Sequence, residues 1–426
     1  MRILLFLSCL IALVAPLSGQ IGYPSIHSNF DERKVGTYQL PDLLTTSGGV
    51  RITDEQAWNK IRRPEIDRLL EEQEYGRSPS APKGMRFEVV EPATPALDGL
   101  AVRKQIAIHL TSDDGPTLHL LLYTPAKATK PAPVLLNLSF TSNANTVEDP
   151  GVKPGTVWGP NHTQVIPPPV PEARRLGAVP LQRLLHEGYG FATFYYGDVE
   201  PDSADGLPYG IRARYLSSKD AHPAGDEWGA IAAWAWGVSR AQDYLETDPQ
   251  VDAKHVAIMG VSRLGKTILW AGAHDTRFAL VIASCSGEGG ASLSHRDYGE
   301  TVANMNKGFA YQFAANYQKY GSDPAHMPFD AHMLVALIAP RPLLLQTGSL
   351  DLWSDPKGEF LAEVAADPVY HLLGTDGLET DKWPPPGLPL VTTLGYFMHD
   401  GGHGTLPDDW QVFINFLNIQ LRAKMN

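Results

Sequence analysis

A serine in a glycine-containing turn is the first residue whose surroundings indicate chemistry. Ser262 lies two residues after Gly260, behind an apolar run that begins at His255 and ahead of a helical pattern. A strand, a tight turn and a helix form the nucleophile elbow, in which a strained backbone holds the serine oxygen exposed above a sheet. The usual pattern also has glycine two positions after the serine, but here Leu264 stands there and Gly265 follows. An ordinary turn with a capping serine is the alternative.

A serine hydroxyl needs a general base, and the base needs an acid that orients it. His403 lies in a glycine-rich loop directly after the last apolar run, and Asp351 follows the run before it. This gives the chain order serine, acid, histidine that is typical of the elbow fold. His399 competes as the base, but the flanking glycines favour His403. An aspartate after a strand is also commonly a helix cap or a solvated turn.

The elements that must position these residues are short, unbroken apolar runs separated by helical stretches. An antiparallel hairpin is predicted first, and six further strands then alternate with helices, which indicates a mostly parallel sheet covered on both faces. The clearest helix is predicted over 227–245, and the elbow helix over 267–274. The predicted strands are 101–110, 117–123, 133–138, 190–196, 255–259, 278–284, 342–347 and 390–397.

The organisation before and between the strands predicts one catalytic domain. Residues 1–19 have the charged start, short apolar middle and small-residue end of a signal peptide, so we expect export to the periplasm or secretion without stable membrane insertion. Residues 20–426 are then a single α/β domain with an N-terminal helical extension. That helix is predicted to start at a capping box of Thr53 and Gln56 and to end near Tyr75. The long loops at 141–172 and 197–226 are expected to build the binding site.

Composition excludes several classes of protein. The 426 residues carry a formal net charge of −12, which is the wrong sign for binding nucleic acid. Of the two cysteines, Cys9 lies in the leader and only Cys285 remains in the mature chain. The histidines show no ligand spacing, so we expect no metal and no cofactor. We expect a monomer.

The motif around the serine resembles that of the glucuronoyl esterases, carbohydrate esterase family 15, in their bacterial branch. Gly260 to Lys266 reads Gly-Val-Ser-Arg-Leu-Gly-Lys, which is similar to the family signature, and the likeness extends over nearly the whole mature chain. Further matches are Ser286 to Gly290, Gly299 to Thr301, Leu350 to Pro356, the His403 loop, and Trp58, 62–65 and 75–76 in the N-terminal helix. The resemblance implies an α/β-hydrolase, a three-layer sandwich around a mostly parallel sheet.

The resemblance also implies roles for individual residues. Ser262 would be the nucleophile and His403 the base, while Arg263 would stabilise the oxyanion. Three further residues would contact the uronate ring, namely Lys266, Glu300 and Trp353. In the alternative interpretations the two cations decorate the start of a helix, Trp353 belongs to the core and Glu300 is a solvated helix residue. Cations are electrostatically disfavoured at a helix N-terminus, which argues for a function.

The chain departs from the family pattern at two places. Many members carry the triad acid as a glutamate where this chain has Cys285, and a thiol cannot replace a carboxylate beside an imidazolium. Asp351 must then be the acid, with Glu288 as a weaker substitute. The second departure is Gln312-Phe313, where relatives tend to have Trp-Phe.

The function that these residues predict is that of a metal-free serine esterase. It would hydrolyse 4-O-methyl-glucuronoyl esters that link xylan glucuronic acid to lignin alcohols, through an acyl-enzyme. One rival is an acetylxylan or other carbohydrate deacetylase, which would have little use for Lys266 and Glu300. Another is an inactive hydrolase fold that only binds carbohydrate.

Overall fold

The computed structural model describes residues 28–169, 179–216 and 224–422, so the expected signal peptide at 1–19 lies outside the described residues. The strands are β1 (Arg86–Ala96), β2 (Ala101–His109), β3 (Thr117–Pro125), β4 (Ala132–Ser139), β5 (Val157–Trp158), β6 (Gln164–Val165), β7 (Gly190–Tyr195), β8 (Val251–Val261), β9 (Leu280–Ser284), β10 (Leu343–Gly348) and β11 (Leu394–His399). The α-helices are α1 (Glu55–Ala57), α2 (Arg63–Leu70), α3 (Asn143–Thr146), α4 (Leu181–His186), α5 (Ala230–Leu245), α6 (Arg263–His274), α7 (Val302–Gly308), α8 (Ala331–Ile338), α9 (Pro356–Leu372) and α10 (Asp409–Gln420).

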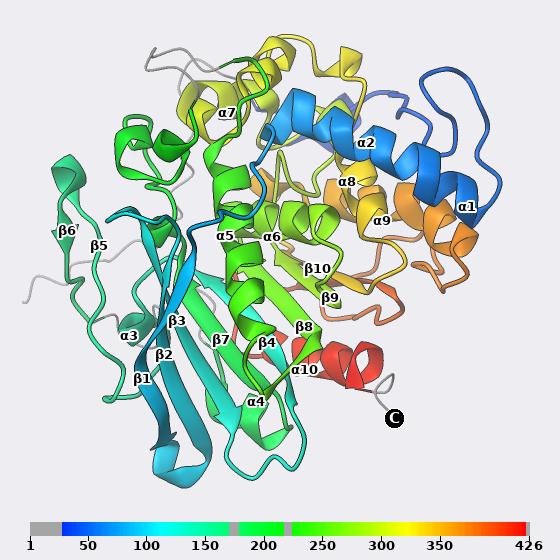
Figure 1. Ribbon diagram of the computed structural model, residues 1–426. Helices are drawn as coiled ribbons and strands as arrows, with labels where there is room; N and C mark the ends of the chain where they lie inside the picture. The colour runs from blue at the N-terminus through cyan, green and yellow to red at the C-terminus, as the bar shows by residue number, and fades with distance from the viewer. Residues whose placement is uncertain (1–27, 170–178, 217–223, 423–426) are drawn as a thin grey trace, which may run out of the picture.

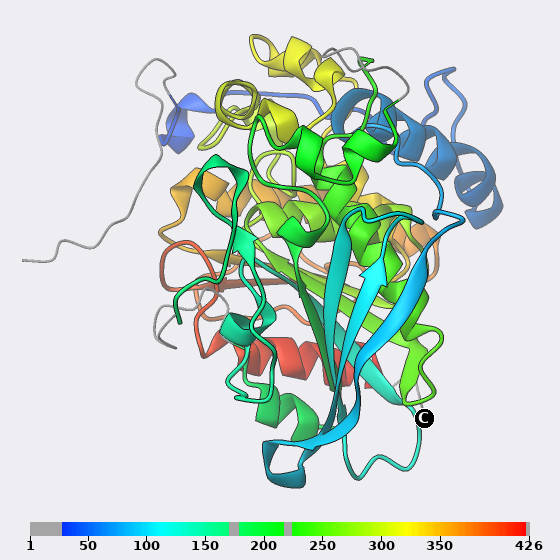
Figure 2. The same ribbon diagram turned by 60° about the vertical axis from the view of Figure 1, so that its left-hand side comes forward.

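A nine-stranded sheet runs through the molecule in the order β1-β2-β3-β7-β4-β8-β9-β10-β11 (Figure 1). The first three strands are antiparallel, as Figure 2 shows from the side where they come forward, and β3 also pairs antiparallel with β7. From β7 to β11 every neighbouring pair is parallel. The mostly parallel sheet and all eight predicted strands are therefore confirmed.

Both faces of this sheet are covered by apolar cores. Successive side chains of a strand point to opposite faces, and in the parallel strands the side chains on both faces are mostly apolar. In β4, Val134 and Leu136 join one apolar core while Leu135 joins the other. The helices α5, α6, α8 and α9 contribute to the first core, and α4 and α10 to the second. The predicted three-layer arrangement follows from this alternation. Among the described residues, none of the helices combines the length and apolar character that crossing a bilayer requires.

The N-terminal helical extension is continuous from residue 55 to residue 75. It consists of α1, a π-helical turn (Trp58–Arg62), α2 and a second π-helical turn (Glu71–Tyr75). The predicted capping residue was wrong by one position. Asp54, not Thr53, has the extended backbone of an N-cap, and its carboxylate accepts from the Ala57 N–H at 2.8 Å.

Three further elements differ from the sequence-based expectation. The elbow helix α6 starts at Arg263 and not at residue 267, because it begins directly after the Ser262 turn. The sheet has nine strands rather than eight, because β1 is an edge strand whose side chains are mostly exposed and include two prolines, so it shows no apolar alternation. The helix predicted from residue 227 starts only at Ala230. Glu227 forms a parallel bridge with Arg77, and the Gly229 N–H donates to the Tyr75 carbonyl at 2.8 Å, so this segment stays extended.

Candidate active site

Ser262 stands at a strained turn between β8 and α6. Its backbone has φ 59° and ψ −131°, a conformation that L-residues rarely adopt, and α6 begins at the next residue. The turn is tight because a Cβ on Gly260 would lie 2.4 Å from the Leu264 carbonyl, and one on Gly265 would lie 2.9 Å from the Ser284 carbonyl. Gly265 therefore takes the place of the glycine expected one position earlier. The Ser262 side chain makes no capping hydrogen bond to α6, so it does not act as an ordinary helix cap.

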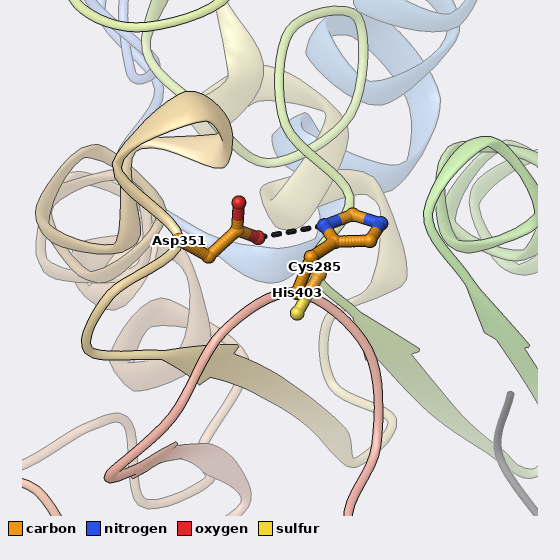
Figure 3. Close-up of side chains that lie close together, drawn as sticks. All are labelled: Cys285, Asp351 and His403. Atoms are coloured by element: carbon orange, nitrogen blue, oxygen red, sulfur yellow. Dashed lines mark hydrogen bonds and ion pairs between the residues drawn. The ribbon is translucent and has the colours of Figure 1, made fainter. Parts of the chain in front are cut away.

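His403 and Asp351 form a hydrogen-bonded pair above the ends of β10 and β11. The Nδ1 of His403 lies 2.7 Å from Oδ2 of Asp351, and Figure 3 shows the other ring nitrogen pointing away from the carboxylate. Burial raises the pKa of Asp351, but the hydrogen bond and charge of His403 outweigh it, so the pKa lies below the usual aspartate value. The Asp351 side chain is only 5% exposed, whereas that of His403 is 38% exposed. Asp351 thus orients the imidazole through Nδ1, and the other ring nitrogen, Nε2, faces away from the carboxylate.

His399, the competing histidine, belongs to a different network. Its Nδ1 lies 2.8 Å from Asp409, and its Nε2 lies 2.8 Å from the Gly402 carbonyl. The residue is buried at 4% exposure. Both ring nitrogens are engaged in supporting the loop that carries His403, so the structure does not present His399 as a base.

Cys285 lies behind His403 at the end of β9. Its Sγ is within hydrogen-bond distance of the Gly404 N–H at 3.4 Å, and burial, followed by the charge of Asp351, raises the pKa of the thiol well above its usual value. Cys285, Asp351 and His403 each place one possible metal-ligand atom within 4.8 Å of the others (Figure 3). Two ligand atoms of a tetrahedral zinc ion lie roughly 3.3 Å apart. Nδ1 of His403 and Oδ2 of Asp351 are only 2.7 Å apart, so these two atoms have the spacing of a hydrogen bond and not that of two zinc ligands.

Glu288 is buried and hydrogen-bonded to two other side chains. Its Oε1 accepts hydrogen bonds from Ser294 at 2.5 Å and from Tyr317 at 2.6 Å. Burial raises the pKa of this carboxyl to about 8. These contacts occupy the Glu288 carboxylate in the interior, and they are not contacts with the imidazole of His403, which the sequence-based alternative assigned to it.

Three predicted sugar-contacting residues meet in one network. The Nζ of Lys266 donates to Glu300 at 2.9 Å and to the Glu288 carbonyl at 2.5 Å, and Trp353 Nε1 donates to the other oxygen of Glu300 at 2.9 Å. Lys266 is 4% exposed, and the Glu300 side chain is 11% exposed, so Glu300 is not a solvated helix residue. Trp353 is only partly buried, so it is not a core residue either. Lys266 anchors this network one helical turn beyond Ser262.

Arg263 faces an acid that the sequence-based reasoning missed. Its Nη1 donates to Oδ2 of Asp202, and its guanidinium stands over the ring of Phe309 at 5.2 Å from Cζ to the ring centre. Gln312, at the position where relatives tend to have Trp, is buried and donates to Asp202 at 2.8 Å. The only sequence signal for Asp202 was its place in a long loop after a strand, where binding sites are commonly built.

Five of these residues follow the carboxyl ends of strands in the parallel part of the sheet, in which β8, β9, β10 and β11 are adjacent. Asp202 comes after β7, Ser262 after β8, Cys285 after β9, Asp351 after β10 and His403 after β11. The carboxyl edge of an open parallel sheet is where α/β proteins bind ligands. The arrangement has the parts of a nucleophilic ester hydrolysis, because a partly exposed serine, an oriented imidazole and a fixed guanidinium share this edge.

Comparison with known proteins agrees with this geometry. Residues 220–374 match the family model described as glucuronyl esterase, fungi. The curated carbohydrate esterase MZ0003, from an unknown prokaryotic organism, is 42% identical over 395 residues, which cover 91% of each chain. The 4-O-methyl-glucuronoyl methylesterase of Cerrena unicolor is 27% identical and matches 84% of this chain and 66% of its own.

Solved structures give the same result. A glucuronoyl esterase from Solibacter usitatus superposes with a TM-score of 0.86 at 42% identity, covering 91% of this chain and 99% of that one. A glucuronoyl esterase of family 15 from Teredinibacter turnerae gives 0.76 at 33% identity over 89% of each chain. The chain therefore belongs to carbohydrate esterase family 15, the glucuronoyl esterases, and is a carboxylic ester hydrolase with the α/β-hydrolase fold.

Proposed function

We propose that this chain hydrolyses 4-O-methyl-glucuronoyl esters that join xylan glucuronic acid to lignin alcohols, with Ser262 as nucleophile. The observation that carries the proposal is that Lys266, one helical turn after Ser262, forms a hydrogen-bonded network with Glu300 and Trp353. A simple acetate ester offers nothing for such a network to bind. A uronate ring offers several hydroxyls and an apolar face, which suit charged hydrogen-bond partners beside an indole.

In the first half of the reaction, His403 removes the Ser262 proton as the oxygen attacks the ester carbonyl. Asp351 holds the imidazole in the tautomer with its proton on Nδ1 and stabilises the imidazolium that forms. Negative charge develops on the carbonyl oxygen, where the Arg263 backbone N–H at the start of α6 and its guanidinium can donate. The C–O bond to the alcohol then breaks, and the alcohol leaves with the proton from His403.

In the second half, water attacks the acyl-enzyme. His403 takes a proton from the water and returns it to Ser262 as the ester bond to the serine breaks. The uronic acid leaves as a carboxylate. Every step uses side chains that the fold holds at one edge of the sheet, and each of these roles is part of the proposal.

The proposal includes export and a single catalytic domain. Residues 1–19 carry the sequence pattern of a cleaved leader, and a xylan–lignin ester is a substrate found outside the cell. The domain would span 20–426, because one sheet and its two apolar cores connect the described parts of the chain. Sequencing the N-terminus of the protein recovered from culture medium or periplasm tests the leader.

The test of the activity compares three substrates at equal protein concentration: benzyl glucuronate, methyl glucuronate and acetylated xylan. We expect the two glucuronate esters to be turned over much faster than acetylated xylan. Ser262→Ala is the control, and it should abolish turnover while leaving the thermal unfolding curve unchanged. Preferential deacetylation would overturn the substrate assignment, and wild-type rates in Ser262→Ala would overturn the nucleophile.

A further inference from the structure

The carboxylate of Asp202 collects four hydrogen bonds beside Arg263. Oδ1 accepts from the Tyr311 hydroxyl at 2.6 Å and from the Gln312 amide at 2.8 Å, while Oδ2 accepts from the Tyr196 hydroxyl at 2.9 Å and from the guanidinium of Arg263. The side chain is 10% exposed. A carboxylate that is fixed by three neutral donors from two separate segments forms a rigid mount for a cation.

This mount leaves most of the guanidinium available. Asp202 uses one of the five N–H donors that an arginine carries. The Phe309 ring limits movement on the face of the guanidinium. Arg263 is therefore held in one orientation while its other N–H groups remain available for hydrogen bonds, as the stabilisation of a transient oxyanion requires.

The ion pair of Arg263 with Asp202 also offsets the positive charge of the arginine. Both cations of the site have a carboxylate partner, because Arg263 pairs with Asp202 and Lys266 pairs with Glu300. Asp351 adds a third carboxylate, which is hydrogen-bonded to His403. With His403 neutral, these groups sum to a formal charge of −1. Such a site is not set up to retain an anion by long-range attraction.

The charge of the ligand changes during the reaction that we assign to the site. The ester that enters is neutral at its carboxyl group, and hydrolysis by water gives an alcohol and a uronic acid, which releases its proton to become a carboxylate. An unpaired arginine beside that product would hold it as a salt bridge. Interactions that bind the transition state but not the product raise turnover, whereas interactions that bind the product slow its release.

We propose that Asp202 is a positioning residue for the esterase reaction: it fixes the guanidinium of Arg263 for the oxyanion and offsets its charge so that the anionic uronate leaves. The inference rests on the proposed function. It separates two roles of one arginine. While it is paired with Asp202, Arg263 can still donate a hydrogen bond to the reacting oxygen, but its positive charge no longer attracts anions from a distance.

The experiment measures kcat and KM on benzyl glucuronate, and the inhibition constant of free glucuronate, for wild type, Asp202→Asn and Asp202→Glu. Asp202→Asn should lower kcat about tenfold and tighten glucuronate inhibition about tenfold, the size of one partly screened ion pair. The tighter inhibition should weaken as salt is added. Asp202→Glu keeps the charge, so the glucuronate inhibition constant should stay near the wild-type value even where kcat falls.

Asp248→Asn is the matched control, because it removes another buried carboxylate, the partner of Lys104, at the amino end of β8. It should lower thermal stability without changing glucuronate inhibition. If Asp202→Asn behaves like this control, the role of Asp202 is only structural and the inference is overturned.

A wild-type enzyme that does not hydrolyse benzyl glucuronate overturns the proposed function, and with it this inference. An active wild type whose glucuronate inhibition is unchanged in Asp202→Asn overturns the inference alone. If Asp202→Asn does not fold, the salt dependence of glucuronate inhibition in the wild-type enzyme tests the inference instead. Inhibition that weakens steeply with salt would show an uncompensated cation and contradict the pairing.

Discussion

Cys285 and Gly404 exchange two hydrogen bonds across the ends of β9 and the His403 loop: the Gly404 N–H donates to Sγ at 3.4 Å, and Sγ donates to the Gly404 carbonyl at 3.5 Å. The thiol thereby holds the backbone next to His403 rather than the imidazole itself. The carboxylate contact of the ring comes from Asp351 instead. Support of the loop and orientation of the ring are thus divided between two residues, and they can be tested separately.

Asp351→Asn should reduce turnover of a soluble glucuronate ester by up to about 10⁴-fold, the loss seen when a serine-protease triad aspartate becomes asparagine, because the ring takes the wrong tautomer. Cys285→Ala should cost far less, since a buried thiol behaves mainly as a small hydrophobe. Turnover numbers of the two variants are compared. Cys285→Glu in the Asp351→Asn background should partly restore turnover. A nearly unaffected Asp351→Asn would refute Asp351 as the orienting acid.

Lys266→Met should lower turnover of a glucuronate ester by about one to two decades, the effect of losing a charged hydrogen bond of roughly 1.5–3 kcal/mol. Turnover of a small activated acetate should change much less, because that substrate has no sugar to contact. Measuring kcat/KM on both esters checks this expectation.

The buried pair of Lys266 and Glu300 requires a control for stability. Removing one partner leaves the other charge unpaired, which destabilises the fold. The double variant Lys266→Met/Glu300→Gln should recover thermal stability without recovering glucuronate activity. An equal loss on both esters, or recovery of activity together with stability, would show that Lys266 acts on the elbow and not on the sugar.

Gly260→Ala should disrupt the elbow, because its new Cβ would lie 2.4 Å from the Leu264 carbonyl. We expect a loss of about 1–3 kcal/mol in the free energy of unfolding, as for other overpacked sites, and a larger proportional loss of activity. Gly402→Ala is the matched control, since no neighbouring atom lies within 4 Å of its added Cβ. Urea unfolding and initial rates are measured for both. Similar effects of the two substitutions would contradict the steric account of the turn.

Glu288→Gln should alter the pH dependence of stability in a defined direction. Burial raises the pKa of Glu288 from 4.5 to about 8, so between these values the folded state binds more protons than the unfolded state. The free energy of unfolding of wild type then falls as pH rises through this window, by up to about 1.4 kcal/mol for each pKa unit. Glutamine does not ionise in this range, so the variant should gain stability relative to wild type as pH rises from about 4.5 to about 8. A constant difference in melting temperature across that range would refute the shift.

Local sequence patterns predicted most of the fold, because the burial of a strand and the shape of a tight turn both depend on residues that are close together in the chain. The six strands predicted after the hairpin are continuous apolar runs, and three of them, β4, β7 and β9, are buried at every residue. The turn at Ser262 could be anticipated because a small-residue motif between a strand and a helix permits little else. β1 was missed because its stability comes from pairing with β2, not from an apolar pattern of its own.

The candidate site was predictable to the extent that it follows strand ends. Asp351 and His403 could be paired from their topological order, and the structure places them in contact. Asp202 could not, because its partner Arg263 lies 61 residues away, and two of its other three contacts, Tyr311 and Gln312, lie 109 and 110 residues away. A carboxylate in a long loop carries no sequence signal that tells a cation's partner from a solvated side chain.

The nine-stranded sheet also has consequences for how the protein behaves at high concentration. Open sheet edges are templates for aggregation, and proteins guard them with charge, proline, bulges or a covering segment. β1 carries Glu88, Glu91 and two prolines, and its pairing with β2 is irregular beside Glu91. At the opposite edge, Leu390 exchanges two backbone hydrogen bonds with Tyr396 of β11. Charge, proline and irregular pairing protect the β1 edge, and the segment at Leu390 covers part of the β11 edge, so both edges are poor templates for pairing with a second sheet.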